Sequence, residues 1–275
     1  MKSRARAAKD STKRAARRTQ RSAPFRILTR MGFAVNGLIH VLIGVIAVQV
    51  ALGGASDKAD HSGALEQMAA APGGVFLLWV VTVGLAALGA SAILEAFTTP
   101  ALDTGERTAA ILKNLGKGVV YFALASTALT FARGGSTDSE QSSRKASSDL
   151  LSLPGGVVIA TLIGASVVAI GLYFIVKGVR RTFTEDVAVP QGSLGTAITI
   201  FGVAGYLAKG IALGVVGVLF VVAAFAVDPK KAAGIDGALK SLVGFPFGGA
   251  LLIIVGAGLV AYGLYSFLRA RYAKI

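Results

Sequence analysis

Six long apolar runs limit what this chain of 275 residues can fold into. Each run contains about 15–20 residues, and roughly 20 helical residues cross the hydrocarbon core of a bilayer. Only helices and closed barrels satisfy the backbone in hydrocarbon, and the runs lack the alternating pattern of barrel strands. The sequence therefore predicts an all-α integral membrane protein with six transmembrane helices. The runs are 37–52, 75–94, 118–132, 157–176, 210–227 and 250–268.

Three of these runs are short, but a further apolar segment precedes each of them. None of the preceding segments contains proline, so each helix can continue through its segment into the headgroup layer. The segments are 27–35, 109–115 and 197–208.

The composition indicates a membrane protein and excludes several kinds of site. Charged residues make up 15% of the chain, whereas a soluble domain carries about a quarter. The absence of cysteine excludes disulfides and thiolate ligands. Because His40 and His61 are the only histidines, we expect no zinc or copper site. Motifs of hydrolases, metalloproteases and nucleotide-binding loops are missing, so we expect neither an enzyme nor a bound cofactor.

The amino-terminal segment 1–24 alternates basic residues with Ala, Ser and Thr. Such a segment cannot bury a core, and we expect a disordered tail that stays in the cytoplasm. Its charges would also bind anionic lipid headgroups, at about 1 kcal/mol per basic residue near the surface. We expect no nucleic-acid binding, because no aromatic residues are interleaved for stacking on bases.

The remaining basic residues predict the orientation of the chain in the membrane. With the tail in the cytoplasm, 20 Lys and Arg side chains fall on that side and 7 on the other, with Lys209 at a boundary. An excess of Lys and Arg marks the cytoplasmic side of a membrane protein. We therefore expect a protein of the bacterial plasma membrane with both termini in the cytoplasm.

One pattern occurs three times along the chain. A polar residue and a glycine open each unit, a proline follows the glycine by 35 or 36 residues, and a second glycine lies 17 residues beyond the proline. The opening pairs are Asn36-Gly37, Lys117-Gly118 and Lys209-Gly210, the prolines are Pro72, Pro154 and Pro246, and the second glycines are Gly89, Gly171 and Gly263. We infer three repeats, at 25–99, 107–183 and 194–272. Each has two spans, joined on the outer side by a crossing with a short interfacial helix.

Because each repeat has two spans, all three share one orientation in the membrane. We therefore expect parallel repeats with a pseudo-threefold arrangement about an axis along the membrane normal. Small residues allow close helix contact in lipid, where apolar side chains gain little from leaving their surroundings. We expect helix crossings at Gly89, Gly171 and Gly263, and a close-packing face at Gly210 and Gly214.

The repeats resemble a bacterial membrane protein family catalogued as domain of unknown function 1206, whose members are typically actinobacterial. The resemblance covers roughly residues 28–272 and depends on Gly32-Phe33, on Gly205-Tyr206-x-x-Lys209-Gly210 and on the three prolines followed by small residues. The middle repeat departs from the pattern, with Lys113 in place of the leading glycine. The resemblance implies the topology, and it implies no catalytic or binding residues, because the family has no established activity.

Three equivalent polar residues are the first candidates for a functional site. Asn36, Lys117 and Lys209 precede the most apolar part of the first helix in each repeat. They could form a polar ring at a cytoplasmic mouth, and two cationic members would favour anions. Alternatively, the lysine stems extend to the headgroups and carry no site.

Three further side chains are candidates for intramembrane polar or ionisable groups. His40 lies one turn beyond Asn36 and Tyr121 is its counterpart, and a histidine there could relay protons or simply pack. Glu95 lies where the other repeats carry Lys177 and Arg269. For Glu95 we expect a salt bridge between repeats, with Lys117 or Lys177.

Two functions remain open. The first is a non-enzymatic membrane protein that packs against partner proteins or lipids and is anchored by its basic tail. Many small residues and few polar groups deep in the spans favour it. The second is a small channel or transporter with a central path lined by the first helix of each repeat. The threefold symmetry and the candidate polar ring favour that alternative.

Overall fold

The structure is a computed structural model that describes residues 22–53, 58–98, 104–228, 234–244 and 246–274. Six of its helices are long and apolar enough to span a membrane, so the predicted fold class is confirmed. They are α2 (Ala23–Ala51), α4 (Gly74–Thr98), α5 (Thr104–Ala132), α7 (Gly156–Val179), α8 (Ser193–Phe225) and α10 (Gly248–Tyr272). The three preceding apolar segments are helical in α2, α5 and α8. Residues 1–21 of the predicted tail lie outside the described residues.

Each repeat also contains a short helix between its two spans, as predicted. These helices are α3 (His61–Ala70), α6 (Ser139–Leu151) and α9 (Ile235–Val243). Asp60 and Asp138 cap α3 and α6 by accepting hydrogen bonds from backbone N–H groups of the first turn. A 3₁₀ helix, η1 (Thr182–Asp186), lies in the connection between the second and third repeats.

The three prolines lie in the turn between the short helix and the second span. The residue after each proline has a left-handed backbone, with φ of 74° at Gly73, 76° at Gly155 and 62° at Phe247. The next residue is glycine in every repeat, because a Cβ there would overlap the carbonyl oxygen of the residue four before the proline. The glycine two residues after each proline is therefore required by the close approach of the backbone.

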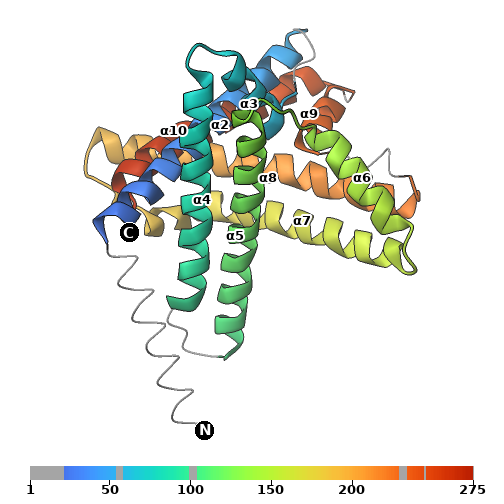
Figure 1. Ribbon diagram of the computed structural model, residues 1–275, viewed down its shortest axis with the longest axis horizontal. Helices are drawn as coiled ribbons and strands as arrows, with labels where there is room; N and C mark the ends of the chain where they lie inside the picture. The colour runs from blue at the N-terminus through green and yellow to red at the C-terminus, as the bar shows by residue number, and fades with distance from the viewer. Residues whose placement is uncertain (1–21, 54–57, 99–103, 229–233, 245, 275) are drawn as a thin grey trace.

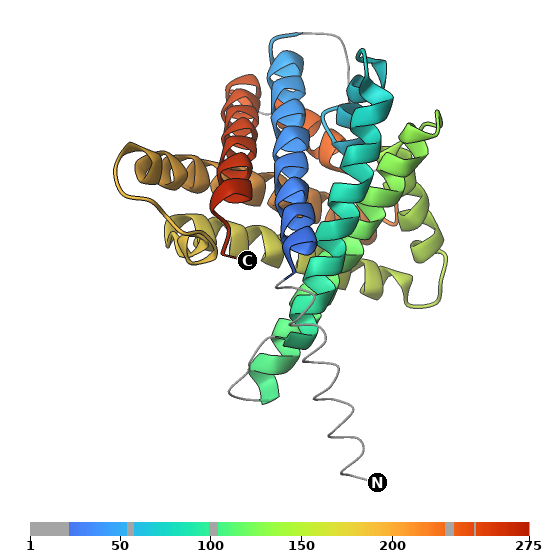
Figure 2. The same cartoon turned by 60° about the vertical axis from the view of Figure 1, so that its left-hand side comes forward.

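The spans form three antiparallel pairs, and each pair joins two different repeats. Figures 1 and 2 show α4 beside α5, α7 beside α8, and α10 beside α2. The second helix of each repeat thus packs on the first helix of the next repeat. The third repeat returns to the first, which closes the ring.

The repeated glycines lie at these crossings. A Cβ added at Gly263 would lie 2.6 Å from the carbonyl oxygen of Gly37, and one at Gly171 would lie 2.7 Å from that of Gly210. At the remaining crossing, a Cβ at Gly118 would lie 3.4 Å from the carbonyl oxygen of Gly89. In each pair, the glycine that opens one repeat meets the second glycine of the repeat before it.

Gly214 differs from the expectation of a close-packing face. A Cβ added there would point into open space, although the Gly214 backbone itself lies against Gly171. The face of α8 that packs on α7 instead uses Gly210 and Gly217, whose Cβ positions are filled by backbone atoms of α7. A spacing of seven residues, two helical turns, keeps both glycines on one face.

Contacts within a repeat follow the threefold pattern twice and break it once. In the first repeat α2 packs on α4, with Gly32 against Gly84, and in the third repeat α8 packs on α10, with Gly205 against Tyr262. In the second repeat α5 and α7 barely approach each other. Lys113 occupies the position equivalent to Gly32, which explains why the close crossing is lost there.

The core lies where the first helices converge with two of the short helices. One buried apolar cluster draws on α2, α4, α5 and α10, with Ala212 from α8, and α3 and α9 add further side chains. α3 packs against α2, α4 and α5, and α9 packs against α8, α10 and α2. α6 contacts α7 and α9 and is mostly exposed, so the second repeat again departs from the other two.

The crossing between α7 and α8 provides a matched pair of substitutions. Gly171→Ala places a methyl group 2.7 Å from a carbonyl oxygen of α8, so we expect the free energy of unfolding to fall by about 1–3 kcal/mol. Gly214→Ala meets nothing within 4 Å, and alanine favours helix, so the same measurement should show no loss. Thermal unfolding of both variants in detergent tests this, and equal effects would contradict the crossing.

Candidate functional site

A buried polar cluster lies between α2, α8, α10 and the start of α3. Its members are Asn36, His40, His61, Lys209 and Tyr262. The His40 ring lies 4.7 Å from the Tyr262 ring and 5.8 Å from the His61 ring. The Lys209 ammonium lies 4.3 Å from the Tyr262 ring centre, within the range of a cation–π interaction.

Hydrogen-bond geometry defines the tautomer of His40. Its Nδ1 lies 2.8 Å from the Asn36 carbonyl oxygen, which can only accept, so Nδ1 carries a proton. Its Nε2 lies 3.3 Å from the Lys209 ammonium, which can only donate. Nε2 is therefore the acceptor, and His40 is a neutral imidazole in this arrangement. Asn36 also pairs through its side chain with Tyr262.

His61 extends the cluster toward the outer side from the first position of α3. Burial lowers the pKa of His61 to about 4, against the opposing effect of the Asp60 carboxylate and with a smaller contribution from the Lys209 charge. His61 is therefore neutral at physiological pH. The cluster therefore contains two neutral imidazoles and one ammonium, and none of its members is a carboxylic acid.

The structure separates the predicted polar ring into two places. Asn36 and Lys209 meet through His40 and Tyr262 in the buried cluster. Lys117 is exposed, and its ammonium donates a hydrogen bond of 3.2 Å to the side-chain oxygen of Asn114. Equivalent positions in the repeats therefore have different surroundings, because the second repeat is not packed like the other two.

A second group of charges lies near the predicted cytoplasmic ends of the helices. We call it the basic group, and it comprises Lys113, Lys117, Lys177 and Arg269, with the acids Glu95 and Asp186. Lys117 lies within electrostatic range of every other member of the group. Four cations and two acids leave the group with an excess of positive charge.

Asp186 joins two different repeats, although it lies in a connection that the sequence indicates is solvated. Its carboxylate lies 2.8 Å from the Lys177 ammonium and 3.7 Å from the Arg269 guanidinium. Aromatic packing holds the connection in place, with the Phe183 ring stacked 5.3 Å from that of Tyr206. Asp186 therefore connects the second repeat to the third through charge pairs.

The other two candidates have less defined roles. Tyr121 lies half-buried on α5, within electrostatic range of Lys209 and Tyr262. Glu95 is exposed at the end of α4, within electrostatic range of Lys117. Lys177, one of its two expected partners, instead forms a salt bridge with Asp186.

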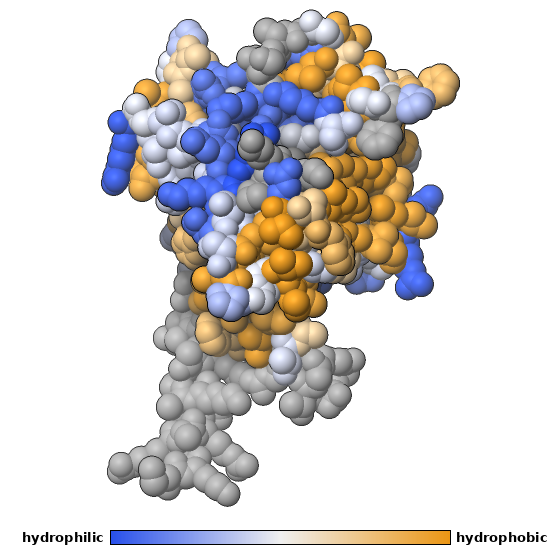
Figure 3. Space-filling view, turned by 90° about the vertical axis from the view of Figure 1, so that its right-hand side faces the viewer, coloured by the Kyte–Doolittle hydropathy of each residue, from blue (hydrophilic) through white to orange (hydrophobic). Residues whose placement is uncertain are grey.

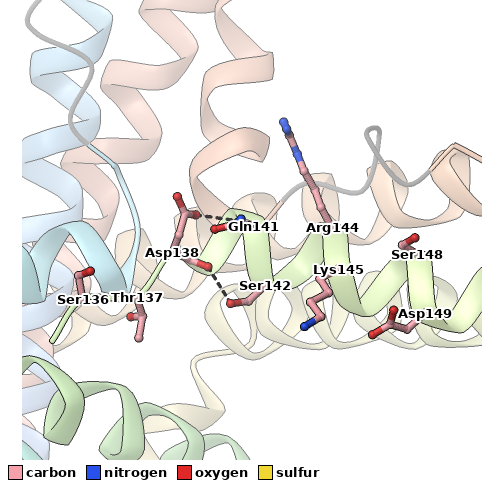
Figure 4. A pocket seen from close by; sticks show the side chains of 9 residues that line it. All are labelled: Ser136, Thr137, Asp138, Gln141, Ser142, Arg144, Lys145, Ser148 and Asp149. Atoms are coloured by element: carbon pink, nitrogen blue, oxygen red, sulfur yellow. Dashed lines mark hydrogen bonds between the residues drawn. The ribbon is translucent and has the colours of Figure 1, made fainter.

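The predicted outer face carries a polar pocket formed by α6 and the residues before it (Figure 4). It is lined by Ser136, Thr137, Asp138, Gln141, Ser142, Arg144, Lys145, Ser148 and Asp149. Figure 3 shows hydrophilic residues gathered on this side of the molecule, beside a broad hydrophobic area. Asp138 uses its carboxylate to cap α6 and to pair with Lys58 at 2.9 Å, so its polar atoms already have structural partners. Within the described residues, no three potential metal ligands lie together.

Some members of the buried polar cluster and of the basic group could not be identified from the sequence. Tyr262 and His61 join the buried cluster from a different repeat and from a short helix, and no spacing pattern connects them to His40. One signal for an altered second repeat is the replacement of glycine by Lys113.

The pairing of Asp186 predicts a pH-dependent stability. Partial burial opposes ionisation, but the charges of Arg269 and Lys177 outweigh it and lower the pKa of Asp186. The folded-state pKa therefore lies below the unfolded value of about 3.9. The resulting stabilisation is present above that value and is lost as the pH falls through the folded pKa.

We expect Asp186→Asn to lower the free energy of unfolding at pH 7 by about 0.5–1 kcal/mol, because the pair is partly exposed and screened. The difference from the wild type should shrink below pH 4 in thermal unfolding experiments. Glu185→Gln is the matched control, since it removes the charge of a neighbouring exposed acid. A loss that is independent of pH, or shared by the control, would contradict the assignment.

Comparisons with known proteins agree with the repeat structure. The family described as Domain of Unknown Function (DUF1206) matches three times, at residues 31–99, 112–181 and 204–273. The chain is also 30% identical over 251 residues to the "Uncharacterized protein YxxB" of Bacillus subtilis (strain 168), which covers 88% of this chain and 89% of that protein. No solved structure matches the chain. Neither match indicates an enzymatic activity, and because the three matches cover most of the sequence, the chain belongs to the DUF1206 family.

Proposed function

We propose that this chain is a non-enzymatic membrane protein that acts by packing against lipids or partner membrane proteins. We place it in the bacterial plasma membrane with both termini in the cytoplasm, where the basic tail contacts anionic lipid headgroups. The positive-inside bias of the sequence supports this orientation.

The packing of the centre is the observation that carries the proposal. A central path would have to run between α2, α5 and α8, and the buried apolar cluster includes side chains from all three of these helices. α3 and α9 add further apolar side chains from the outer side. The filling residues include Ile39 and Ile43 of α2, Ala125 and Ala128 of α5, Ala212 of α8, Leu65 of α3 and Leu239 of α9. An apolar centre favours a protein that works through its outer surface.

The distribution of exposed apolar surface also supports this proposal. Of the most apolar stretch of α7 only 17% is buried, against 56% for α2 and for α10. α5 and α7 therefore present most of their side chains to lipid or to another protein. Exposed apolar surface of this extent is typical of a membrane or interaction face.

The buried polar cluster favours the alternative, a small channel or transporter. His40, His61 and Lys209 place three titratable groups close together, with His40 next to each of the other two. Ionisable groups within spans are costly and are often functional. In that case a solute-dependent flux should exist and should be lost in the Lys117→Ala plus Lys209→Ala variant.

Thiol labelling distinguishes the two functions, because the chain contains no cysteine. Single cysteines at the equivalent positions Ile43, Leu124 and Val216 are exposed to a membrane-impermeant reagent in intact cells and in inverted vesicles. We expect no labelling at any of the three. Ser148→Cys on exposed α6 and Arg180→Cys after α7 serve as positive controls, one for each side. Labelling at all three central positions would overturn the proposal and favour the transporter.

A further inference from the structure

In the second repeat α5 and α7 lie across each other without a close backbone crossing (Figure 1), and we call the region between them the α5–α7 seam. α5 is held by α4 through Gly118 and Gly89, and α7 is held by α8 through Gly210 and Gly171. Between these two pairs no close crossing forms. A Cβ added at Gly116, on the side of α5 near the seam, would meet nothing within 4 Å.

Two lysines lie at the predicted cytoplasmic end of the seam. Lys113 donates a hydrogen bond of 2.9 Å from its ammonium to the Tyr173 hydroxyl of α7, so it bridges the seam. Lys117 follows one turn later on the same side of α5 and is also exposed. In the part of the chain that the structure describes, neither ammonium forms a salt bridge with an acid. Glu95 is within electrostatic range of Lys117, and one acid does not balance two lysines.

Apolar side chains continue the seam from the lysines toward the middle of the membrane. Val120 lies one turn beyond Lys117 on α5 and is 58% exposed, and Ile170 lies one turn from Tyr173 on α7 and is 48% exposed. The seam therefore carries the positive charge of two lysines at one end and exposed apolar surface along the rest.

We propose that the α5–α7 seam binds an anionic phospholipid, with its phosphate at Lys113 and Lys117 and its acyl chains along Val120 and Ile170. The proposal deepens the proposed function and depends on it, because it names the lipid that this surface would hold. Lysine ammonium groups bind phosphate as point charges, and Tyr173 offers a further polar group beside Lys113.

The seam fits a lipid better than another helix. The tight helix pairs of this chain cross at small residues, which let the two backbones approach closely. At the seam, Lys113 and Ser166 replace the glycines found in the first repeat. A rigid partner helix would meet the lysine side chain there, whereas flexible acyl chains can fill an irregular gap.

The experiment uses the full chain in vesicles of phosphatidylcholine with and without phosphatidylglycerol. We expect phosphatidylglycerol to raise the midpoint of thermal unfolding, because a ligand of the folded state stabilises it. In the Lys113→Gln plus Lys117→Gln variant, the lipid fraction needed for half of that rise should increase at least tenfold. The matched control Arg180→Gln plus Arg271→Gln removes two exposed charges outside the seam, and it should respond as the wild type does.

Each other outcome would overturn the lipid assignment. Equal losses in both double variants would indicate general surface attraction to anionic lipid. If inorganic phosphate stabilises the protein as much as phosphatidylglycerol does, the lysines bind a free anion and not a lipid. A dimer in detergent that does not respond to phosphatidylglycerol would indicate a second copy of the chain in the seam. None of these outcomes changes the thiol labelling of the centre, so failure of this proposal and failure of the proposed function can be told apart.

Discussion

Close contact between glycine backbones is the constraint on which the rest of this structure depends. Helices in lipid gain little from burying apolar side chains against each other, so they associate where small residues allow their backbones to touch. Here one glycine from each repeat meets the second glycine of the preceding repeat, at Gly37 and Gly263, at Gly118 and Gly89, and at Gly210 and Gly171. Those three contacts arrange the repeats in a ring.

The surroundings of the polar and charged side chains depend on how closely the two helices of each repeat pack in this ring. In the first and third repeats the two helices also cross closely, and the polar residues Asn36 and Lys209 are enclosed with His40 and Tyr262. In the second repeat Lys113 prevents the equivalent crossing, and Lys117 stays exposed beside it. The replacement of glycine by Lys113 thus explains why α5 and α7 do not cross closely and why positive charge lies between them.

The sequence predicts what depends on local pattern, and it is silent on what depends on contacts between repeats. Hydrophobic length predicts the six spans, and fixed offsets predict the repeats and the glycines that lie at their crossings. The same offsets predict that Asn36, Lys117 and Lys209 form one ring. Such a ring requires equivalent neighbours around all three residues, and the neighbours of Lys117 differ from those of the other two. His61 and Asp186 escape prediction because their partners lie far away in the chain, at His40 and at Arg269.

Spin-label distances at the cytoplasmic ends of the three repeats test the broken threefold symmetry most directly. One label is placed on the first helix and one on the second helix of each repeat, at equivalent exposed positions in the cysteine-free chain. The pairs are Ile27 and Phe97, Thr108 and Val179, and Ile200 and Arg271. We expect a longer distance for the middle pair than for either of the others. Three equal distances would contradict it, because the second repeat would then be packed like the first and the third.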